Sequence, residues 1–474
     1  MRPLWTVAEV VKATGGHPEG VSDGPISSVL IDSREIVPEG LFVAIKGDKL
    51  DGHDYVTKAL EAGAAAALVS EAHFKALGGE GVIVVPDTLK ALEALGIAAR
   101  ARNRGQIVAV TGSAGKTTTK EAIRAVLAAF GETHYSIKSF NNHWGVPLML
   151  ARLPREAQFG VFEIGMNHAG EIAQLVKMVR PHVAVITTVA AAHLEFFNSV
   201  SDIAAAKAEI FLGLEPGGTA VLNADHDYLH VLFAHARAAG VSKVVTYGFD
   251  DSSDWHIVKA ENSPKGTLAE VVHQREHYNF HLQVPGRHMV ANAVAAVAVA
   301  HASGEGTRAA IGALSNFGAP EGRGLTLKLG PAKQPLLLVD ESYNANVASM
   351  NAAMDVFAGI QPPEGKKVLV LGDMLEMGPQ GPQLHAALLG AALKTGARQV
   401  FLVGPAMRAL ADEFARLAES DRDTPSVTHM PTTDEITEQV LAALAYGDAV
   451  MVKGSNGVRL SQLVQKIRER FESA

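Results

Sequence analysis

Short apolar runs recur along this chain, and stretches rich in helix-forming residues separate them. The runs are residues 41–45, 65–69, 81–87, 107–110, 159–165, 182–189, 336–340, 368–373, 399–404 and 448–455. Runs of this length that alternate with amphipathic stretches predict strands alternating with helices. Such an alternation favours parallel sheets with helices on both faces. We therefore expect an α/β protein.

The chain has 474 residues, which is too many for one hydrophobic core. Residues 1–85 mix short strands and helices, and they predict a small α/β domain. Residues 86–320 open with an amphipathic helix, a strand and a glycine turn, which is typical of a P-loop ATPase-type parallel sheet. Residues 321–474 alternate again and predict a Rossmann-like α/β domain. The glycine-rich stretch 318–324 between the last two is a candidate hinge.

The glycine turn carries the clearest candidate chemistry. The segment VTGSAGKTTTKE follows an apolar run, and a helix-forming stretch follows it. A helix N-terminus leaves backbone N–H groups unpaired, and a preceding glycine turn lets them close around a polyphosphate. Lys116 adds a charge for the β- and γ-phosphates, and the Thr117 hydroxyl can hold Mg²⁺. The residues expected to contact the nucleotide here are Gly112, Ser113, Ala114, Gly115, Lys116, Thr117 and Thr118.

This turn is a variant of the phosphate-binding loop, because the spacing G-x-x-x-x-G-K-[ST] would place its first glycine at Val110. Without a strand before it and a helix after it, a tight connection with an exposed lysine would be an equal alternative. The bound nucleotide could serve a switch, a kinase or a ligase. Guanine-specific GTPases usually carry Asn-Lys-x-Asp, and the chain has no Asn-Lys pair, which speaks against a switch.

Three further side chains are candidates for metal and phosphate binding. Glu163 ends the run 159–165, where a carboxylate can bind Mg²⁺ opposite Thr117 or can simply face solvent. His193 follows another strand, although a lone histidine is more often a satisfied core residue. Lys207 lies on an apolar helical stretch, where snorkelling is the common arrangement. A partly buried lysine loses its charge more easily, and its neutral amine can react with CO₂ to form a carbamate.

Composition narrows the class of protein. The formal net charge of -8 and the pI of about 6.2 argue against a nucleic-acid partner. No cysteine is present, which excludes disulfides, thiolate nucleophiles and cysteine metal sites. The run 289–302 is too short to span a bilayer and contains Asn292, and the start MRPLWTVAEVV lacks an apolar core of signal-peptide length. We therefore expect a cytoplasmic enzyme without membrane insertion.

Several motifs occur in a characteristic order along all three blocks. They are TGSAGKTTTKE, NNHWGVPL, FEIGMNHAGEI, AAHLEFF, AKAEIF, VPGRHMVANAVAA, EGRG, DESYNANVASM, VLGDMLEMG and VKGSNGVRL. The ordered set resembles the Mur ligases of peptidoglycan synthesis, whose glycine turn commonly lacks the first glycine. The N-terminal stretch that begins IDSREIVPEG is similar to the UDP-binding domain of two branches of that family.

The resemblance implies an ATP-dependent ligase that joins D-alanyl-D-alanine to UDP-N-acetylmuramoyl-tripeptide through an acyl phosphate, with ATP and Mg²⁺ as cofactors. It implies a monomer that closes its domains around three reactants. The implied catalytic residues are Lys116, Glu163, His193, Lys207 and Arg323. The implied metal ligands are Thr117, Glu163, His193 and a carbamylated Lys207. The implied further nucleotide contacts are Asn292, Arg323, Asp340, Tyr343 and Asn344. The expected contacts to the UDP substrate are Ser33, Arg34, Asn141, Asn142, Asn167 and His168.

Each family-derived role has a plainer alternative. Arg323 could be a surface arginine in a linker, Asp340 could cap the helix that starts near Val347, and Asn292 could bridge backbone groups within a helix. Two departures from the family pattern are Asn141-Asn142-His143-Trp144-Gly145, where Asn-Asn-Glu-Ile-Gly is frequent, and Asn346-Val347, where Asn-Pro is frequent.

Three other functions compete with this one. A sister ligase that adds a single amino acid shares the first block, but the Asp-Asn-Pro-Arg string of its diaminopimelate form is absent. A folylpolyglutamate synthase lacks the N-terminal DSR and DGH pattern. A catalytically silent nucleotide-binding protein would not need the intact set of charged candidates described above.

Overall fold

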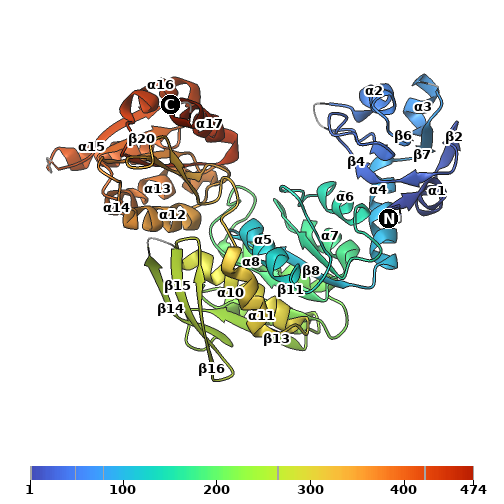
Figure 1. Ribbon diagram of the computed structural model, residues 1–474, viewed down its shortest axis with the longest axis horizontal. Coiled ribbons are helices and arrows are strands. Elements are labelled where there is room, and N and C mark those ends of the chain that lie inside the picture. The colour runs from blue at the N-terminus through green and yellow to red at the C-terminus, as the bar shows by residue number, and fades with distance from the viewer. Residues whose placement is uncertain (1–2, 48–49, 78, 264–265, 421–422, 473–474) are drawn as a thin grey trace.

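The computed structural model describes residues 3–47, 50–77, 79–263, 266–420 and 423–472. Within these ranges the chain forms three α/β units, and each is built on its own large sheet (Figure 1). The N-terminal and C-terminal units lie at opposite ends of the molecule, and the middle unit joins them. The α/β class that the alternating runs predict is confirmed.

The N-terminal unit contains a five-stranded sheet in the order β2-β7-β6-β5-β4. Strands β4 to β7 run parallel, and the edge strand β2 runs antiparallel to β7. A small pair, β1 (Trp5–Thr6) and β3 (Pro25–Ile26), lies beside it. The remaining elements are α1 (Val7–Thr14), β2 (His17–Glu19), β4 (Ser28–Leu30), β5 (Gly40–Val43), η1 (Gly52–Tyr55), α2 (Val56–Glu61), β6 (Ala66–Ser70), α3 (Glu71–Leu77) and β7 (Val82–Val85).

Helix α4 (Thr88–Arg102) connects the N-terminal unit to the middle unit. Asp87 caps its first turn by accepting a 2.9 Å hydrogen bond from the Lys90 N–H. On one side the helix packs against α1, and on the other it packs against α6 (Gly145–Ala151) and α7 (Glu171–Val179). The sequence-based division at residue 85 therefore falls just before a helix that both hydrophobic cores share.

The middle unit contains a nine-stranded sheet in the order β16-β15-β14-β13-β12-β11-β8-β10-β9. Val108 and Val110 of β8 pack towards α5 and α10, whereas Ile107 and Ala109 pack towards α4, α6 and α7. This alternation is the period of two of a pleated strand that is buried on both faces. The strands are β8 (Gln106–Thr111), β9 (Thr133–Tyr135), β10 (Phe159–Glu163), β11 (Val183–Ile186), β12 (Thr219–Asn223), β13 (Lys243–Gly248), β14 (Trp255–Ser263), β15 (Gly266–His273) and β16 (Glu276–Leu282). The helices are α5 (Lys116–Leu127), α8 (Val200–Ala208), η2 (Glu209–Gly213), α9 (Leu229–Ala238), α10 (Arg287–Ala302), α11 (Thr307–Ala313) and η3 (Leu314–Asn316).

Strands β14 to β16 form an antiparallel extension of this sheet, which the expectation of parallel sheets does not include. His273 pairs with Glu276, so two residues make the turn between β15 and β16. Both of them, Gln274 and Arg275, have positive φ, as a tight hairpin requires. Antiparallel pairing follows because a two-residue connection leaves no room for a crossover helix.

The C-terminal unit contains a six-stranded sheet in the order β17-β18-β22-β19-β20-β21. It is parallel except for the edge strand β17, and a separate core lies on each of its faces. Its strands are β17 (Leu325–Leu329), β18 (Leu336–Glu341), β19 (Lys367–Gly372), β20 (Gln399–Val403), β21 (Ser426–Met430) and β22 (Ala449–Lys453). Its helices are α12 (Val347–Gly359), η4 (Gly378–Gln380), α13 (Gly381–Ala386), α14 (Leu389–Lys394), α15 (Arg408–Ala418), α16 (Thr433–Ala443), η5 (Asn456–Val458) and α17 (Leu460–Glu472). Across the described ranges, no helix combines the length and apolar character that a membrane span needs.

Candidate active site

The glycine turn joins the carboxyl end of β8 to the first turn of α5, as the sequence predicts. Gly112 packs so closely against Thr187, the residue after β11, that an added Cβ would lie 1.9 Å from its hydroxyl oxygen. Gly115 has φ +81 and caps α5. The Lys116 amine donates a 2.8 Å hydrogen bond to the Gly112 carbonyl, so the lysine folds back over the loop. Backbone N–H groups and an ammonium group thus meet at one helix N-terminus.

A buried carboxylate lies opposite the start of α5. The Thr117 hydroxyl donates a 2.8 Å hydrogen bond to Glu163 Oε2, and the Asn141 amide donates one of the same length to Oε1. Glu163 is only 1% exposed, and its partners here are neutral. A hydroxyl and a carboxylate at the phosphate loop are hard oxygen donors of the kind that Mg²⁺ prefers. The pair therefore fits a magnesium ion held next to bound phosphates.

Burial lowers the pKa of Lys116 below the ordinary lysine value. The Glu163 carboxylate opposes this shift, and the charge of Arg323 adds to it. Arg323 reaches this point from the junction of the middle and C-terminal units. Its guanidinium lies 4.2 Å from the centre of the Tyr343 ring, and the Tyr343 hydroxyl is hydrogen-bonded to Ser139 in the middle unit. Two cations that are close enough to affect each other favour an anionic ligand between them.

Lys207, on α8, is 1% exposed. Burial, and to a smaller extent the charge of Lys116, hold its pKa well below the ordinary lysine value. In the described part of the chain, its amine has no hydrogen-bond or ion-pair partner. A buried amine without an anion favours its neutral form, which is the form whose nitrogen attacks the carbon of CO₂ and loses a proton to give a carbamate.

His193 lies in the loop after β11 and contacts the C-terminal unit. Its Nδ1 lies 2.5 Å from Oε2 of Glu376, and this hydrogen bond lowers the pKa of Glu376. Glu376 was not predicted from the sequence to be a site residue. It lies 183 residues from His193, so only the docking of the two units brings them together.

A cavity of about 530 Å³ lies between the middle and C-terminal units and contains most of the predicted site. The predicted residues that line it are Ser113, Ala114, Gly115, Lys116, Thr117, Thr118, Asn141, Glu163, Asn167, His193, Asn292, Arg323, Tyr343 and Asn344. Asn292 lies under the loop, where its Oδ1 accepts a 3.0 Å hydrogen bond from Thr119. Predicted residues at or after the carboxyl ends of β8, β10, β11 and β18, from two units, therefore converge on one space.

Other predicted residues stand apart from the cavity lining. Asp340, at the end of β18, is buried and accepts hydrogen bonds from the Ser342 N–H and hydroxyl. Asn142 accepts from the Gly145 N–H at the start of α6, and His168 Nδ1 is 2.9 Å from Glu171 at the start of α7. The helix that starts at Val347 is capped by Asn346 and not by Asp340.

Ser33 and Arg34 lie in the N-terminal unit, in the loop after β4. Arg34 is exposed and paired with Asp32, whose pKa its hydrogen bonds lower to about 2. The next residue, Glu35, forms a 2.7 Å ion pair with Lys138 of the middle unit. Lys138 precedes Ser139, which lines the cavity. The predicted uridine loop is thus connected to the edge of the cavity.

Several cavity residues from the C-terminal unit were not predicted from the sequence. Lys453 ends β22 and is buried, with its amine 3.2 Å from Glu341 and 3.0 Å from the Asn344 carbonyl. Asn346 donates from its side chain to the Ser113 carbonyl at 3.1 Å. The signal was available, because Lys453 and Glu341 both stand at carboxyl ends of apolar runs.

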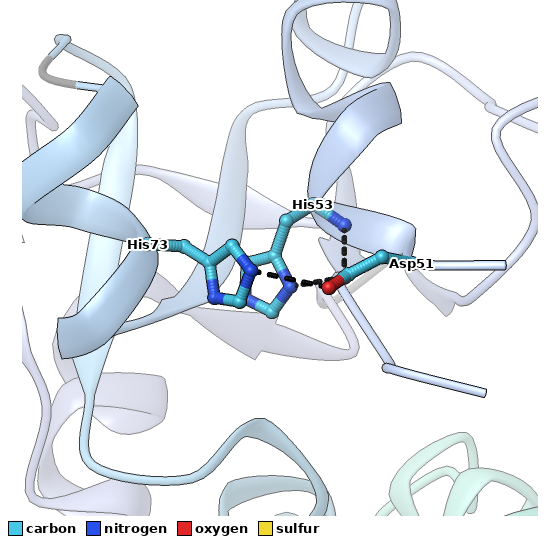
Figure 2. Close-up of side chains that lie close together, drawn as sticks. All are labelled: Asp51, His53 and His73. Atoms are coloured by element: carbon cyan, nitrogen blue, oxygen red, sulfur yellow. Dashed lines mark hydrogen bonds and ion pairs between the residues drawn. The ribbon is translucent and has the colours of Figure 1, made fainter. Parts of the chain in front are cut away.

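Asp51, His53 and His73 form a separate cluster in the N-terminal unit (Figure 2). Asp51 lies 2.6 Å from His53 Nδ1 and 3.1 Å from His73 Nε2, and the two rings stack with centroids 3.8 Å apart and 10° between their planes. A metal lies near the plane of each imidazole that binds it, at about 2.1 Å, so rings stacked in this way cannot share one ion. The Ser70 N–H also donates to His53 Nε2, which places the ring proton on Nδ1 facing Asp51. The cluster is therefore hydrogen-bonded rather than a formed metal centre.

Comparisons with known proteins agree with the geometry of the cavity. Three family models match: Mur ligase family, catalytic domain, over residues 25–130; Mur ligase middle domain, over residues 110–300; and Mur ligase, glutamate ligase domain, over residues 328–456. The structure is similar to crystal structure I of MurF from Acinetobacter baumannii, with a TM-score of 0.83 and 28% identity, covering 98% of this chain and 99% of that one. The MurF ligase of Thermotoga maritima, solved in complex with ADP, has the same fold, with a TM-score of 0.76 and 24% identity, covering 94% and 98%.

Sequence similarity to curated relatives extends over nearly the whole chain. The UDP-N-acetylmuramoyl-tripeptide–D-alanyl-D-alanine ligase of Escherichia coli strain K12 is 34% identical over 466 residues, which cover 98% of each chain. The enzyme of that name from Bacillus subtilis strain 168 is 31% identical over 468 residues, covering 99% of this chain and 98% of its own. Because the similarity covers all three units and includes the phosphate loop and the residues around it, the chain belongs to the Mur ligase family.

Proposed function

We propose that this chain is the ATP-dependent ligase that joins D-alanyl-D-alanine to UDP-N-acetylmuramoyl-tripeptide, with release of ADP and phosphate. The observation that carries the proposal is the cavity between the middle and C-terminal units. It combines a phosphate loop, a buried carboxylate and an arginine from the domain junction. The curated relatives of the same extent carry this activity in their names.

The first step activates a carboxylate that does not condense with an amine in water. A carboxylate oxygen of the tripeptide attacks the γ-phosphorus of ATP, the bond to the β-γ bridging oxygen breaks, and ADP leaves. This transfer depends on positioning and on neutralisation of charge. Lys116 and the loop N–H groups bind the phosphates. Arg323, whose guanidinium lies over the Tyr343 ring, neutralises the negative charge that develops on the transferred group.

Thr117 and Glu163 would hold one Mg²⁺, and His193 with a carbamylated Lys207 would hold a second. Bound magnesium neutralises phosphate oxygens during the transfer. The chain supplies the matching donors: a buried carboxylate with neutral partners, a histidine with one ring nitrogen free, and a buried amine whose pKa burial lowers. A carbamate on that amine would provide the anionic oxygen that a lysine ammonium cannot.

In the second step, the free amine of D-alanyl-D-alanine attacks the acyl carbon. The tetrahedral intermediate then expels phosphate, and the amine proton leaves to phosphate or solvent. Holding the reactants in a closed cleft provides much of the rate enhancement. We assign the dipeptide to the C-terminal side of the cavity and the uridine nucleotide to the loop of Ser33 and Arg34. The enzyme acts in the cytoplasm as a monomer.

One assay separates the competing functions. Phosphate release is measured with ATP, Mg²⁺ and UDP-N-acetylmuramoyl-tripeptide, with D-alanyl-D-alanine as amine in one arm and single amino acids in the other. Turnover that requires the dipeptide supports the proposal. Turnover with single amino acids and not with the dipeptide would identify the sister ligase. ATP binding without turnover in any arm would identify a silent nucleotide-binding protein.

A further inference from the structure

Two short segments from different units form a close contact at one edge of the cavity. They are residues 193–195 of the middle unit and residues 376–378 of the C-terminal unit. The Glu195 N–H donates a 3.2 Å hydrogen bond to the Glu376 carbonyl, alongside the side-chain bond from His193 to Glu376. Gly378 lies so close that an added Cβ would be 3.3 Å from Glu195 Cα. Backbone and side chain therefore fix the same pairing.

Both segments of the contact contain a non-glycine residue with a left-handed backbone conformation. His193 has φ +58 and Glu376 has φ +62, a region that non-glycine residues rarely occupy. Such conformations persist where the surrounding structure determines them. The loop that contains Glu376 is fixed by contacts within the C-terminal unit. The Met374 N–H donates to His385 Nε2 at 2.9 Å, and the Leu375 N–H donates to the Ser455 hydroxyl at 3.0 Å.

The contact leaves the two nitrogens of the His193 ring with different tasks. His193 lines the cavity, whereas Glu376 is outside the set of described residues that line it. When Nδ1–H of the neutral ring donates to the carboxylate, the lone pair of the ring lies on Nε2. A carboxylate behind a histidine in this way fixes the tautomer and raises the basicity of the other nitrogen.

From this geometry we infer that Glu376 is a positioning residue for His193. We infer further that docking of the C-terminal unit completes the cation site to which His193 contributes. The inference rests on the proposed function for the role of His193. It adds a residue from another unit that lies outside the cavity lining. Cation binding and domain docking are then coupled, because each stabilises the state in which the other occurs.

The experiment measures cation binding directly and needs no turnover. Full-length protein with ADP is titrated with Mn²⁺, and free Mn²⁺ is followed by electron paramagnetic resonance. We expect Glu376→Ala to weaken the affected Mn²⁺ site about 10-fold, because loss of such a supporting carboxylate typically costs 10-fold or more. Glu376→Gln, which keeps an acceptor for Nδ1–H, should fall between Glu376→Ala and the wild type. Asp227→Asn removes an exposed carboxylate of the middle unit outside this contact and is the matched control, which should leave Mn²⁺ binding unchanged.

Two further measurements distinguish the loss of His193 positioning from a general loss of native structure. Nitrogen-15 spectra of the histidine rings, assigned with His193→Gln, should show Nδ1–H in the wild type and a mixture of tautomers in Glu376→Ala. Gly378→Val adds side-chain bulk against Glu195 at a backbone with φ +59 that a β-branched residue strains, so it should loosen the contact between the two segments while it keeps the Glu376 carboxylate, and it should weaken Mn²⁺ binding to a similar extent. Unchanged binding and an unchanged tautomer in Glu376→Ala would overturn the inference. Unchanged binding in Gly378→Val, with small-angle scattering showing that the units have separated, would overturn the dependence on docking.

Because Mn²⁺ binding is read without substrates, failure of the proposed ligase reaction would leave this result standing. In the active enzyme, Glu376→Ala should raise the Mg²⁺ concentration required for half-maximal rate about 10-fold, and kcat at saturating Mg²⁺ should change less. A loss of kcat without any change in the Mg²⁺ requirement would contradict the positioning role.

Discussion

Asn346 links the start of helix α12 to the phosphate loop through Ser113. Its Oδ1 accepts from the Ser349 N–H at 2.9 Å and caps the helix, while its Nδ2 donates to the Ser113 carbonyl at 3.1 Å. One side chain therefore stabilises a helix of the C-terminal unit and docks that helix on the nucleotide site. Cap and docking contact use different atoms, so they can be separated by substitution.

We expect Asn346→Asp to keep the cap and to disrupt the docking. The carboxylate still accepts from Ser349 but places a negative oxygen against the Ser113 carbonyl, next to bound phosphates. Losing a buried hydrogen bond in this way costs about 1–3 kcal/mol, which corresponds to roughly 5- to 150-fold weaker ADP binding in a calorimetric titration. Asn351→Ala, on the same helix but outside the cavity lining, is the control and should leave ADP affinity within about 2-fold. Equal ADP affinities for Asn346→Asp and the wild type would show that the contact does not support the site.

The phosphate loop and its carboxylate give a second prediction. Lys116→Ala and Glu163→Gln should each reduce phosphate release by about 10³-fold, because each removes charge that a low-dielectric site uses to stabilise the transferred phosphoryl group. Both proteins should keep the wild-type circular dichroism spectrum. Glu132→Gln, an exposed change in the same unit, is the control. Near-normal turnover in either of the first two variants would remove that residue from the phosphate site.

The sequence predicted those contacts of the site that form within one sheet, and it did not predict the contacts between separately folded units. Thr117 and Glu163 could be paired in advance, because Glu163 ends β10, Thr117 lies in the first turn of the helix that follows β8, and the two strands are neighbours in the sheet. The apolar runs located the strands for a similar reason, since burial on both faces leaves a continuous hydrophobic signal.

Contacts between units have no such local signal. Glu376 contacts His193 across 183 residues, and Asn346 contacts Ser113 across 233. Both pairs depend on how separately folded units dock, which no periodicity records. The antiparallel strands β14 to β16 were missed for another reason. Their only local sign is a two-residue turn, and Gln274-Arg275 does not contain the glycine or asparagine usual at positive φ.

Lys207 gives a third prediction, which concerns its carbamate. We expect Lys207→Ala to lose about 10²- to 10³-fold in phosphate release, and added acetate or another short carboxylic acid to restore part of the rate by supplying an anionic oxygen in the vacated space. Lys177→Ala on the exposed face of α7 is the control for removal of a lysine, and it should show no response to acetate. Full activity of Lys207→Ala without acid would exclude the residue from the mechanism. An inactive variant that no acid rescues would favour a protonated lysine paired with a phosphate oxygen.

His134 on β9 predicts how stability depends on pH. Its Nε2–H donates to the Met149 carbonyl at 2.8 Å, and burial, together with the charge of Arg152, lowers its pKa to about 4 despite that hydrogen bond. In the unfolded chain the pKa returns to about 6.5, so between pH 6.5 and 4 the unfolded state binds a proton that the folded state does not. Stability contributed by neutral His134 is therefore complete above pH 6.5 and falls as the pH drops, by about 1–2 kcal/mol at pH 5. His134→Gln keeps a donor for the Met149 carbonyl and should reduce the change in the urea midpoint between pH 7 and pH 5. Exposed His143→Gln is the control, and an identical pH dependence in all three proteins would contradict the assignment.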